Sequence, residues 1–179
     1  MRKNNKIYLI TKFNDFLEKN DEPLKFIGMA IFIFALLQIV YFKLYIGSEF
    51  FFKYLQYCAS LSKDILVFIG EPVRVSSRVI SHEAGPSVTV VEGCDALRIF
   101  SVLVAAILAY KGSFIQKLIG IIFGISFLFG FNLLRISSLL WIDVYYSDLF
   151  DMFHHVILPF LLWLIALTYF YCWGRVIDK

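Results

Sequence analysis

The sequence predicts an all-α integral membrane protein: a bundle of about four transmembrane helices with an amphipathic surface helix and a small β-hairpin on the outer face. Three observations predict this class, namely the composition, a set of long apolar runs, and the placement of basic residues between them. Of 179 residues, 60% are hydrophobic and 20 are phenylalanine, and the mean hydropathy is +0.75. A soluble domain of this size cannot bury that much apolar surface, so lipid must cover part of it.

Four apolar runs approach the roughly 20 residues that a helix needs to cross a bilayer. The predicted spans are residues 26–46, 96–110, 118–141 and 152–173. The second run is short, and it reaches a spanning length only if Cys94 and Asp95 lie at its membrane entrance. All four belong to one predicted membrane domain over residues 1–179.

The positive-inside rule predicts the orientation, because lysine and arginine accumulate in short cytosolic loops. Six basic residues precede the first run, two separate the second and third runs, and two follow the fourth. Residues 142–151, between the third and fourth runs, contain three aspartates and no lysine or arginine. We therefore expect residues 1–25 to be a cytosolic lead-in and residues 142–151 to lie outside.

Residues 47–93 form the largest region between the predicted spans, and we expect it on the outer face. Residues 51–69 place apolar side chains on one side and charged ones such as Lys53 on the other, which predicts a helix on the membrane surface. The β-branched runs VRVSSRVI and SVTVVEG flank SHEAGP, which predicts a hairpin that forms a small lid. His82 falls at the hairpin tip, where a solvated turn residue is expected.

Charge and cysteine spacing exclude several function classes. The formal net charge of +3 does not suggest a nucleic-acid partner. Three cysteines without a CxxC or Cys/His spacing predict neither a disulfide framework nor a zinc site. We expect no metal and no organic cofactor, whereas membrane lipid is a partner that the composition requires.

Polar side chains on three of the predicted spans meet near the outer end of the bundle. Cys94 opens the second run from the outside. The third run starts inside, so Arg135 lies roughly 25 Å along it, near the outer boundary, with Asn132 one turn deeper. His154 and His155 stand at the outer start of the fourth run. Ionisable groups inside spans are costly, which makes them candidates for function.

A thiol, a guanidinium and an imidazole at one depth favour nucleophilic catalysis. The thiolate is the reactive form of cysteine and is stabilised by nearby cations, so Cys94 can attack a carbonyl while a histidine moves the proton. Arg135 can stabilise the thiolate or the oxyanion of the intermediate. Adjacent helical residues point about 100° apart, so only one of His154 and His155 can face the thiol. The sequence leaves open which one does.

Simpler roles compete for the same residues. Cys94 can be a packing residue or pair with Cys58, and Arg135 can extend to the outer lipid phosphates. Arg98 is either a second cation of the site or a structural partner of Glu92 or Asp95.

Three further residues and one motif have mainly structural interpretations. Asn132 is expected to orient Arg135 through an interhelical hydrogen bond. Cys58 and Cys172 are expected to be packing residues. The small residues Gly120 and Gly124, four apart, predict close helix packing.

Three short motifs follow one another in chain order: Gly93-Cys94 at the start of a span, Asn132-Leu-Leu-Arg135-Ile in the next span, and His154-His155 at the start of the last one. In these motifs, and over residues 72–173, the chain resembles the exosortase/archaeosortase family of membrane cysteine transpeptidases. Members of this family often have a small pair such as Ser-Gly after the cysteine. This chain has Asp-Ala there, which leaves the geometry around the thiol open.

The resemblance implies a cysteine transpeptidase or protease that cleaves the C-terminal sorting signals of exported proteins. Such a signal consists of a short motif, one transmembrane helix and a basic tail. Cys94 is then the nucleophile, Arg135 the oxyanion or thiolate partner, and His154 or His155 the acid and base. The implied location is a bacterial cytoplasmic (inner) membrane, with a multi-pass chain whose active site faces outward. An accessory membrane protein is compatible with this role.

A second hypothesis is a non-enzymatic membrane subunit for transport or assembly. In such a protein, Arg135, the two histidines and the outer acids form a structural or proton-conducting network. The hypotheses differ in what they require of Cys94, because only the enzyme needs its thiol.

Overall fold

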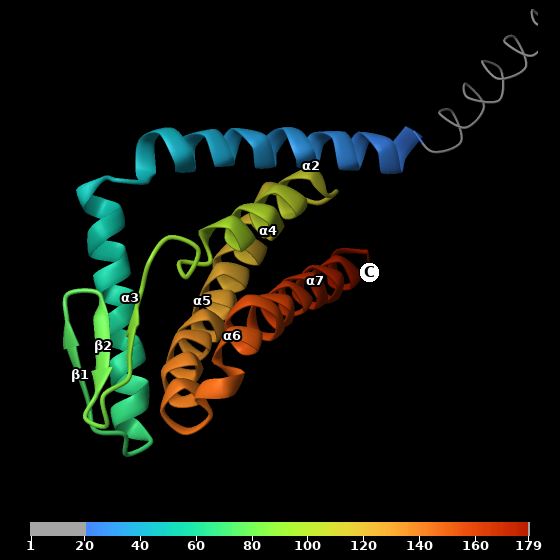
Figure 1. Cartoon of the computed structure of the whole chain (residues 1–179). Coiled ribbons are helices and arrows are strands. Elements are labelled where there is room, and N and C mark those ends of the chain that lie inside the picture. Colours follow the sequence, from blue (N-terminus) through green and yellow to red (C-terminus); the bar gives the residue numbers. More distant parts are fainter. Residues whose placement is uncertain (1–20, 179) are drawn as a thin grey trace, which may run out of the picture.

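The computed structural model describes residues 21–178 as a mostly helical protein with a small antiparallel sheet (Figure 1). Residues 1–20, which make up most of the predicted lead-in, lie outside the described residues. The helices are α2 (Asp21–Val40), α3 (Glu49–Phe68), α4 (Leu97–Ala109), α5 (Phe114–Tyr145), the single turn α6 (Phe150–Met152) and α7 (Leu158–Ile177). The strands are β1 (Val73–Ser76), β2 (Val79–His82) and β3 (Ser87–Thr89). Three short helical segments complete the chain: π-helical η1 (Tyr41–Tyr45) and η3 (Phe153–Ile157), and 3-10 helical η2 (Ser147–Leu149).

Among the described residues, three helical segments are long and apolar enough to cross a membrane: Asp21–Tyr45, Phe114–Tyr145 and Ser147–Ile177. The first begins within the predicted lead-in, five residues before the expected start at residue 26, because Asp21 and Glu22 already form the first turn of α2. The second predicted span, residues 96–110, corresponds to α4, which has only 13 residues. At 1.5 Å per residue α4 extends about 20 Å, less than the hydrocarbon core of about 30 Å.

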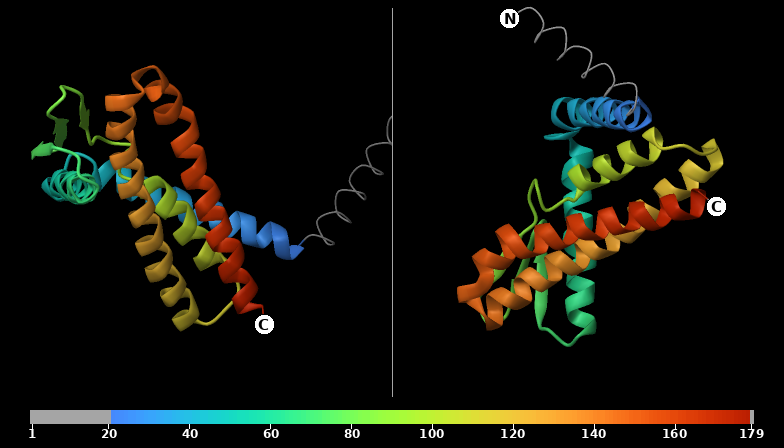
Figure 2. Two further views of the ribbon diagram at one scale, coloured as in Figure 1. Left: turned by 90° about the horizontal axis from the view of Figure 1, so that it is seen from below. Right: turned by 90° about the vertical axis from the view of Figure 1, so that its right-hand side faces the viewer.

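The apolar helices α4, α5 and α7 share one general direction, whereas α2 crosses α5 and α7 at an angle and α3 runs across the bundle (Figure 1 and Figure 2). In the view from below, α3 is seen end-on while the other helices are seen from the side. The sheet, α3 and the turn between α5 and α7 lie toward one end of the bundle, and the C-terminus and the α4–α5 loop lie at the other. Helix α2 packs on α4, and α5 packs on α3, α4 and α7.

Helix α3 agrees with the helix predicted for residues 51–69, but its apolar side packs into protein. Ser48 begins the helix, since its hydroxyl accepts the N–H of Phe51. Leu55, Cys58 and Leu66 are buried in a core shared with the sheet and α5. Ile69 was expected on the same side but is 58% exposed, because the helix ends at Phe68 and the chain turns away there.

The sheet has three antiparallel strands in the order β1-β2-β3, so the prediction of a single hairpin is incomplete. The run VRVSSRVI folds back on itself, with Ser76 paired to Val79 and only Ser77 and Arg78 in the turn. Ser77 has a φ of 57°, the left-handed conformation that two-residue hairpin turns require. Glycine or asparagine usually marks such turns, which is why the Ser-Arg sequence gave no signal.

Close packing of α5 on α4 and α7 depends on two glycines. A Cβ on Gly120 would collide with the indole of Trp173, and one on Gly124 would lie 2.6 Å from both the Tyr169 ring and a Leu103 methyl. The Tyr169 hydroxyl donates a hydrogen bond of 2.7 Å to the Gly120 carbonyl. The prediction that this glycine pair serves helix packing is confirmed.

Candidate active site

Cys94 lies in the loop between β3 and α4, three residues before the helix begins. Gly93 has a φ of 90° and Ala96 a φ of 57°, so the loop changes direction on both sides of the cysteine. The Cys94 N–H donates to the Val91 carbonyl at 3.0 Å, which closes a tight turn. The cysteine is 5% exposed. The sequence predicted Cys94 at the entrance of this helix, and a loop of this shape places it there.

Side chains from α3 and α5 hold three successive carbonyls of this loop. Arg135 Nη1 donates to the carbonyl before Cys94 at 3.3 Å. Asn132 Nδ2 donates to the carbonyl of Cys94 itself at 2.9 Å. The Tyr54 hydroxyl donates to the next carbonyl at 2.8 Å. Asn132 therefore contacts the cysteine's own main chain, whereas the sequence predicted that it would orient Arg135.

Two polar atoms beside the loop are buried without a hydrogen-bond partner among the described residues: Asn132 Oδ1 and Arg135 Nε. Asn132 is 0% exposed and Arg135 is 9% exposed. A guanidinium extended to lipid phosphates would be exposed, so the burial of Arg135 disfavours that alternative. Buried polar groups are nearly always paired, so unpaired ones beside a cysteine suit a site that receives a further polar group.

The histidines lie in π-helical η3, at the start of the last long segment. His154 is partly buried and His155 is exposed, and their rings are 4.4 Å apart between centroids. Arg135 lines a cavity of about 190 Å³ together with Leu158 and Leu161, which follow His154 by one and two turns. The structure thus leaves His155 on the surface and keeps His154 partly buried.

Arg98 forms an ion pair of 2.9 Å with Glu92, and both side chains are about half exposed. Its guanidinium also lies 5.4 Å from the centre of the Phe42 ring. Of the two roles considered for Arg98, the structure favours the structural partner of Glu92.

Cys58, Cys94 and Cys172 are all free thiols, so the alternative disulfide between Cys58 and Cys94 does not form. Cys58 packs in the same core as Cys94, as expected. Burial is the main cause that raises the pKa of Cys58 to about 11, and the neighbouring Tyr54 hydroxyl partly opposes the effect. Cys172 is exposed on α7, so the prediction that it packs inside the chain is wrong.

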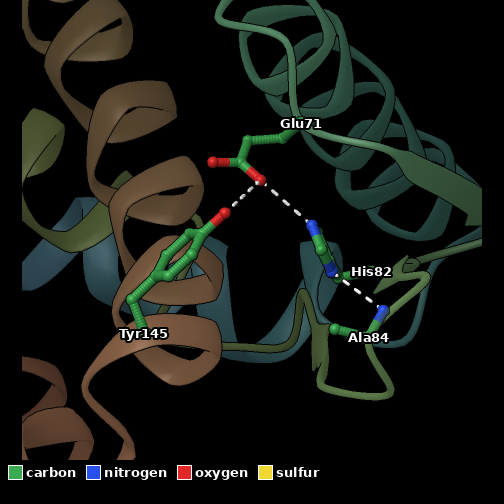
Figure 3. Close-up of polar contacts among 4 residues, drawn as sticks. All are labelled: Glu71, His82, Ala84 and Tyr145. Atoms are coloured by element: carbon green, nitrogen blue, oxygen red, sulfur yellow. Dashed lines mark hydrogen bonds and ion pairs between the residues drawn. The ribbon is translucent and has the colours of Figure 1, made fainter.

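His82 is not the solvated turn residue that the sequence predicted. It ends strand β2, and its side chain is 8% exposed. Its Nε2 lies 3.0 Å from the carboxylate of Glu71, which also accepts a hydrogen bond from Tyr145 on α5, and its Nδ1 accepts the Ala84 N–H at 3.0 Å (Figure 3). Both ring nitrogens are occupied, so this histidine is unsuited to proton transfer. It ties the sheet to the end of α5.

These observations define a class: a membrane protein with several apolar helices, whose buried cysteine is held by an asparagine and an arginine of the neighbouring span. No group of three or more histidine, cysteine or acidic residues that could hold a metal occurs within residues 21–178.

The model of the transmembrane exosortase family (Exosortase_EpsH) matches residues 21–172, and the chain belongs to this family. The resemblance noted from the three motifs is thereby confirmed. The exosortases are cysteine transpeptidases. No curated protein and no solved structure matches the chain.

Proposed function

We propose that this protein is an exosortase-type cysteine transpeptidase or protease that cleaves the C-terminal sorting signals of exported proteins at the outer face of a bacterial cytoplasmic membrane. The observation that carries the proposal is that Asn132 and Arg135 both donate hydrogen bonds to the loop of Cys94. It joins the first two family motifs, which lie 38 residues apart, in one site. The third motif contributes His154 on the adjoining segment.

The proposed reaction proceeds in two acyl-transfer steps. The Cys94 thiolate attacks the scissile carbonyl, and the bond that forms between sulfur and carbon converts the carbonyl oxygen to an oxyanion. The oxyanion collapses, the carbon–nitrogen bond breaks, and the leaving amine takes a proton from His154. An amine, a hydroxyl or water then attacks the thioester carbon and gives its proton to His154. The carbon–sulfur bond breaks, and the Cys94 thiolate leaves and is regenerated.

Arg135 has a specific place in this scheme. One of its nitrogens is committed to the loop, while Nε is buried and unpaired among the described residues. A fixed cation in a water-poor site stabilises developing negative charge more than it would in water. Its role is to stabilise the oxyanion or the thiolate, and its bond to the loop keeps it beside the nucleophile.

Access from within the membrane fits a substrate that carries one transmembrane helix. An apolar cavity of about 420 Å³ lies between α2, α4 and α5. Two of its lining residues, Tyr41 and Leu97, are hydrogen-bonded to Asp95, the residue after the nucleophile. In this proposal α4 is a short span in addition to the three long ones. The signal helix of the substrate docks beside α4, so that the cleavage motif of the substrate reaches Cys94.

Replacement of the thiol tests the proposal. In cells expressing Cys94→Ala, mass spectrometry of the C-termini of exported proteins should find uncut signals, because no thioester can form. Cys58→Ala and Cys172→Ala are matched controls and should process normally. Normal processing by the Cys94→Ala protein would rule out the enzyme and favour the non-enzymatic membrane subunit.

A further inference from the structure

The residue after the proposed nucleophile carries a buried carboxyl group that the mechanism above does not use. Asp95 is 1% exposed. Its Oδ2 accepts a hydrogen bond of 2.6 Å from the Tyr41 hydroxyl, and its Oδ1 accepts the Leu97 N–H at 3.1 Å. Its main-chain carbonyl is held by the Tyr54 hydroxyl. The two tyrosines come from other elements: Tyr54 lies on α3, and Tyr41 lies in η1 at the end of the first span.

No cation pairs with this carboxyl group among the described residues. Arg98 is the basic residue closest to it in sequence, and Arg98 is paired with Glu92 instead. Burying a carboxyl group without a cation is costly, even when neutral donors satisfy its oxygens. A packed apolar side chain would avoid that cost. The presence of a carboxyl group at this position therefore has to be explained by the local geometry.

The backbone at Ala96 supplies that reason. Ala96 has a φ of 57°, a conformation that costs an L-residue energy and that glycine adopts freely. The carboxyl group of Asp95 reaches across Ala96 to the Leu97 N–H, the first of the helix, as aspartate does when it caps a turn. Ala96 itself is 4% exposed. The hydrogen bond therefore holds the strained residue that links Cys94 to α4.

Tyr41 extends this arrangement to the first span. It is the first residue of π-helical η1, and π-helical turns are frequent at functional sites. Its ring is buried against Phe51 of α3, so the hydroxyl cannot easily turn away from the carboxyl group. The direction of the Cys94 loop thus depends on α2, α3 and α4 together.

We propose that Asp95 is a positioning residue, which, with Tyr41 as its partner, fixes the strained link at Ala96 and so sets the orientation of Cys94. The inference rests on the proposed function, because it assigns a role toward the nucleophile. Hydrogen-bond acceptance is what Asp95 contributes, and its charge is not required.

Three substitutions test this role through the processing of exported C-termini. Asp95→Ala removes both acceptors and should lower the processing rate about a hundredfold, the loss expected from a misplacement of about 1 Å. Asp95→Asn keeps an acceptor for Leu97 and a polar partner for Tyr41, so it should process within about threefold of the native rate. Ala96→Gly in the Asp95→Ala background removes the need to hold a strained residue and should restore most of the rate.

The accessibility of the thiol supplies a readout that does not need the substrate. Iodoacetamide labelling of the purified full chain in detergent, measured by peptide mass, should be about tenfold faster at Cys94 in Asp95→Ala than in the native protein. Labelling of Cys172 in the same molecules is the internal control and should not change.

The outcomes separate the inference from the proposed function. If Asp95→Asn is as inactive as Asp95→Ala, the charge matters and the positioning role is wrong. Native rates in Asp95→Ala also overturn it. Should Asp95→Ala fail to fold, Asp95→Asn and Tyr41→Phe still decide, because the inference requires the former to be active and the latter to be slowed. Normal processing by Cys94→Ala would refute the proposed function instead.

Discussion

The side chain of Asn132 uses its amide N–H on the Cys94 carbonyl and leaves its oxygen unpaired in the described structure. Asn132 and Arg135, one turn apart on α5, together support the Cys94 loop. At this scale the family motif has a physical meaning. The spacing of three places both side chains on one side of a helix, where they reach neighbouring peptide groups of the same loop.

The members of the proposed site could be chosen from the sequence, but the residues that hold the Cys94 loop in place could not. Cys94, Arg135 and His154 stand out because polar groups are rare in apolar runs. Tyr41 and Tyr54 do not stand out, since tyrosines at the ends of spans are usually interface anchors. Asp95 and Ala96 were recognised as a departure from the family's small pair. Their meaning needed the backbone, which shows that Ala96 adopts a glycine-like conformation.

At the residue scale, Cys58 gives a prediction about pH. Burial raises its pKa from 9.0 to about 11, so at neutral pH the thiol is protonated and should not react with iodoacetamide. Its labelling should rise only as the pH approaches that value. Because the pKa of Cys58 is higher in the folded protein than in the unfolded chain, its protonated thiol adds to the free energy of unfolding. This contribution is fully present below about pH 9 and is lost as the pH rises through about 11. Peptide mass analysis of labelling against pH measures this, and rapid labelling at pH 7 would contradict it.

At the scale of elements, the long apolar helices were predictable and the short elements were less so. A run of apolar residues predicts a span whatever surrounds it, which is why α5 and α7 are found as expected. The extra hairpin turn at Ser77 follows from pairing with neighbouring strands, which a local pattern does not encode. His82 was misplaced for the same reason, because its partner Glu71 lies 11 residues earlier.

The packing of α5 yields a prediction with a matched control on the same helix. Gly124→Ala should destabilise the protein by about 1–3 kcal/mol, because the new methyl would overlap the Tyr169 ring and Leu103. Gly130→Ala meets nothing within 4 Å, so it should be neutral or stabilising by up to about 1 kcal/mol. Thermal unfolding in detergent compares the two. Equal stability of both variants would show that the glycines are not the contact between these helices.

At the scale of the whole molecule, the bundle has two distinct ends. One end holds the sheet, α3, the Cys94 loop and η3, and the other holds the α4–α5 loop and the C-terminus (Figure 2). Lys111, Lys117 and Arg175 lie at the second end, and the proposed orientation puts this end in the cytosol, where the positive-inside rule expects the basic residues of short loops.

This orientation predicts a labelling pattern. In a Cys172→Ser background, a cysteine replacing Asp148 should react with a membrane-impermeant maleimide added to intact spheroplasts, because Asp148 is exposed in η2. A cysteine replacing Ser113, at the start of α5, should react only after the membrane is opened. The reverse pattern would place the site in the cytosol and exclude action on exported proteins.

The measurement that bears most directly on the enzyme is the mass of the Cys94 peptide from protein isolated out of acid-quenched cells. The account predicts a fraction carrying a covalently attached polypeptide, released by hydroxylamine as expected for a thioester, and lost in Cys94→Ala. The attached sequence would also identify the substrate. An unmodified Cys94 in cells that are actively trimming sorting signals, or an adduct on Cys58 instead, would contradict the assignment of the nucleophile.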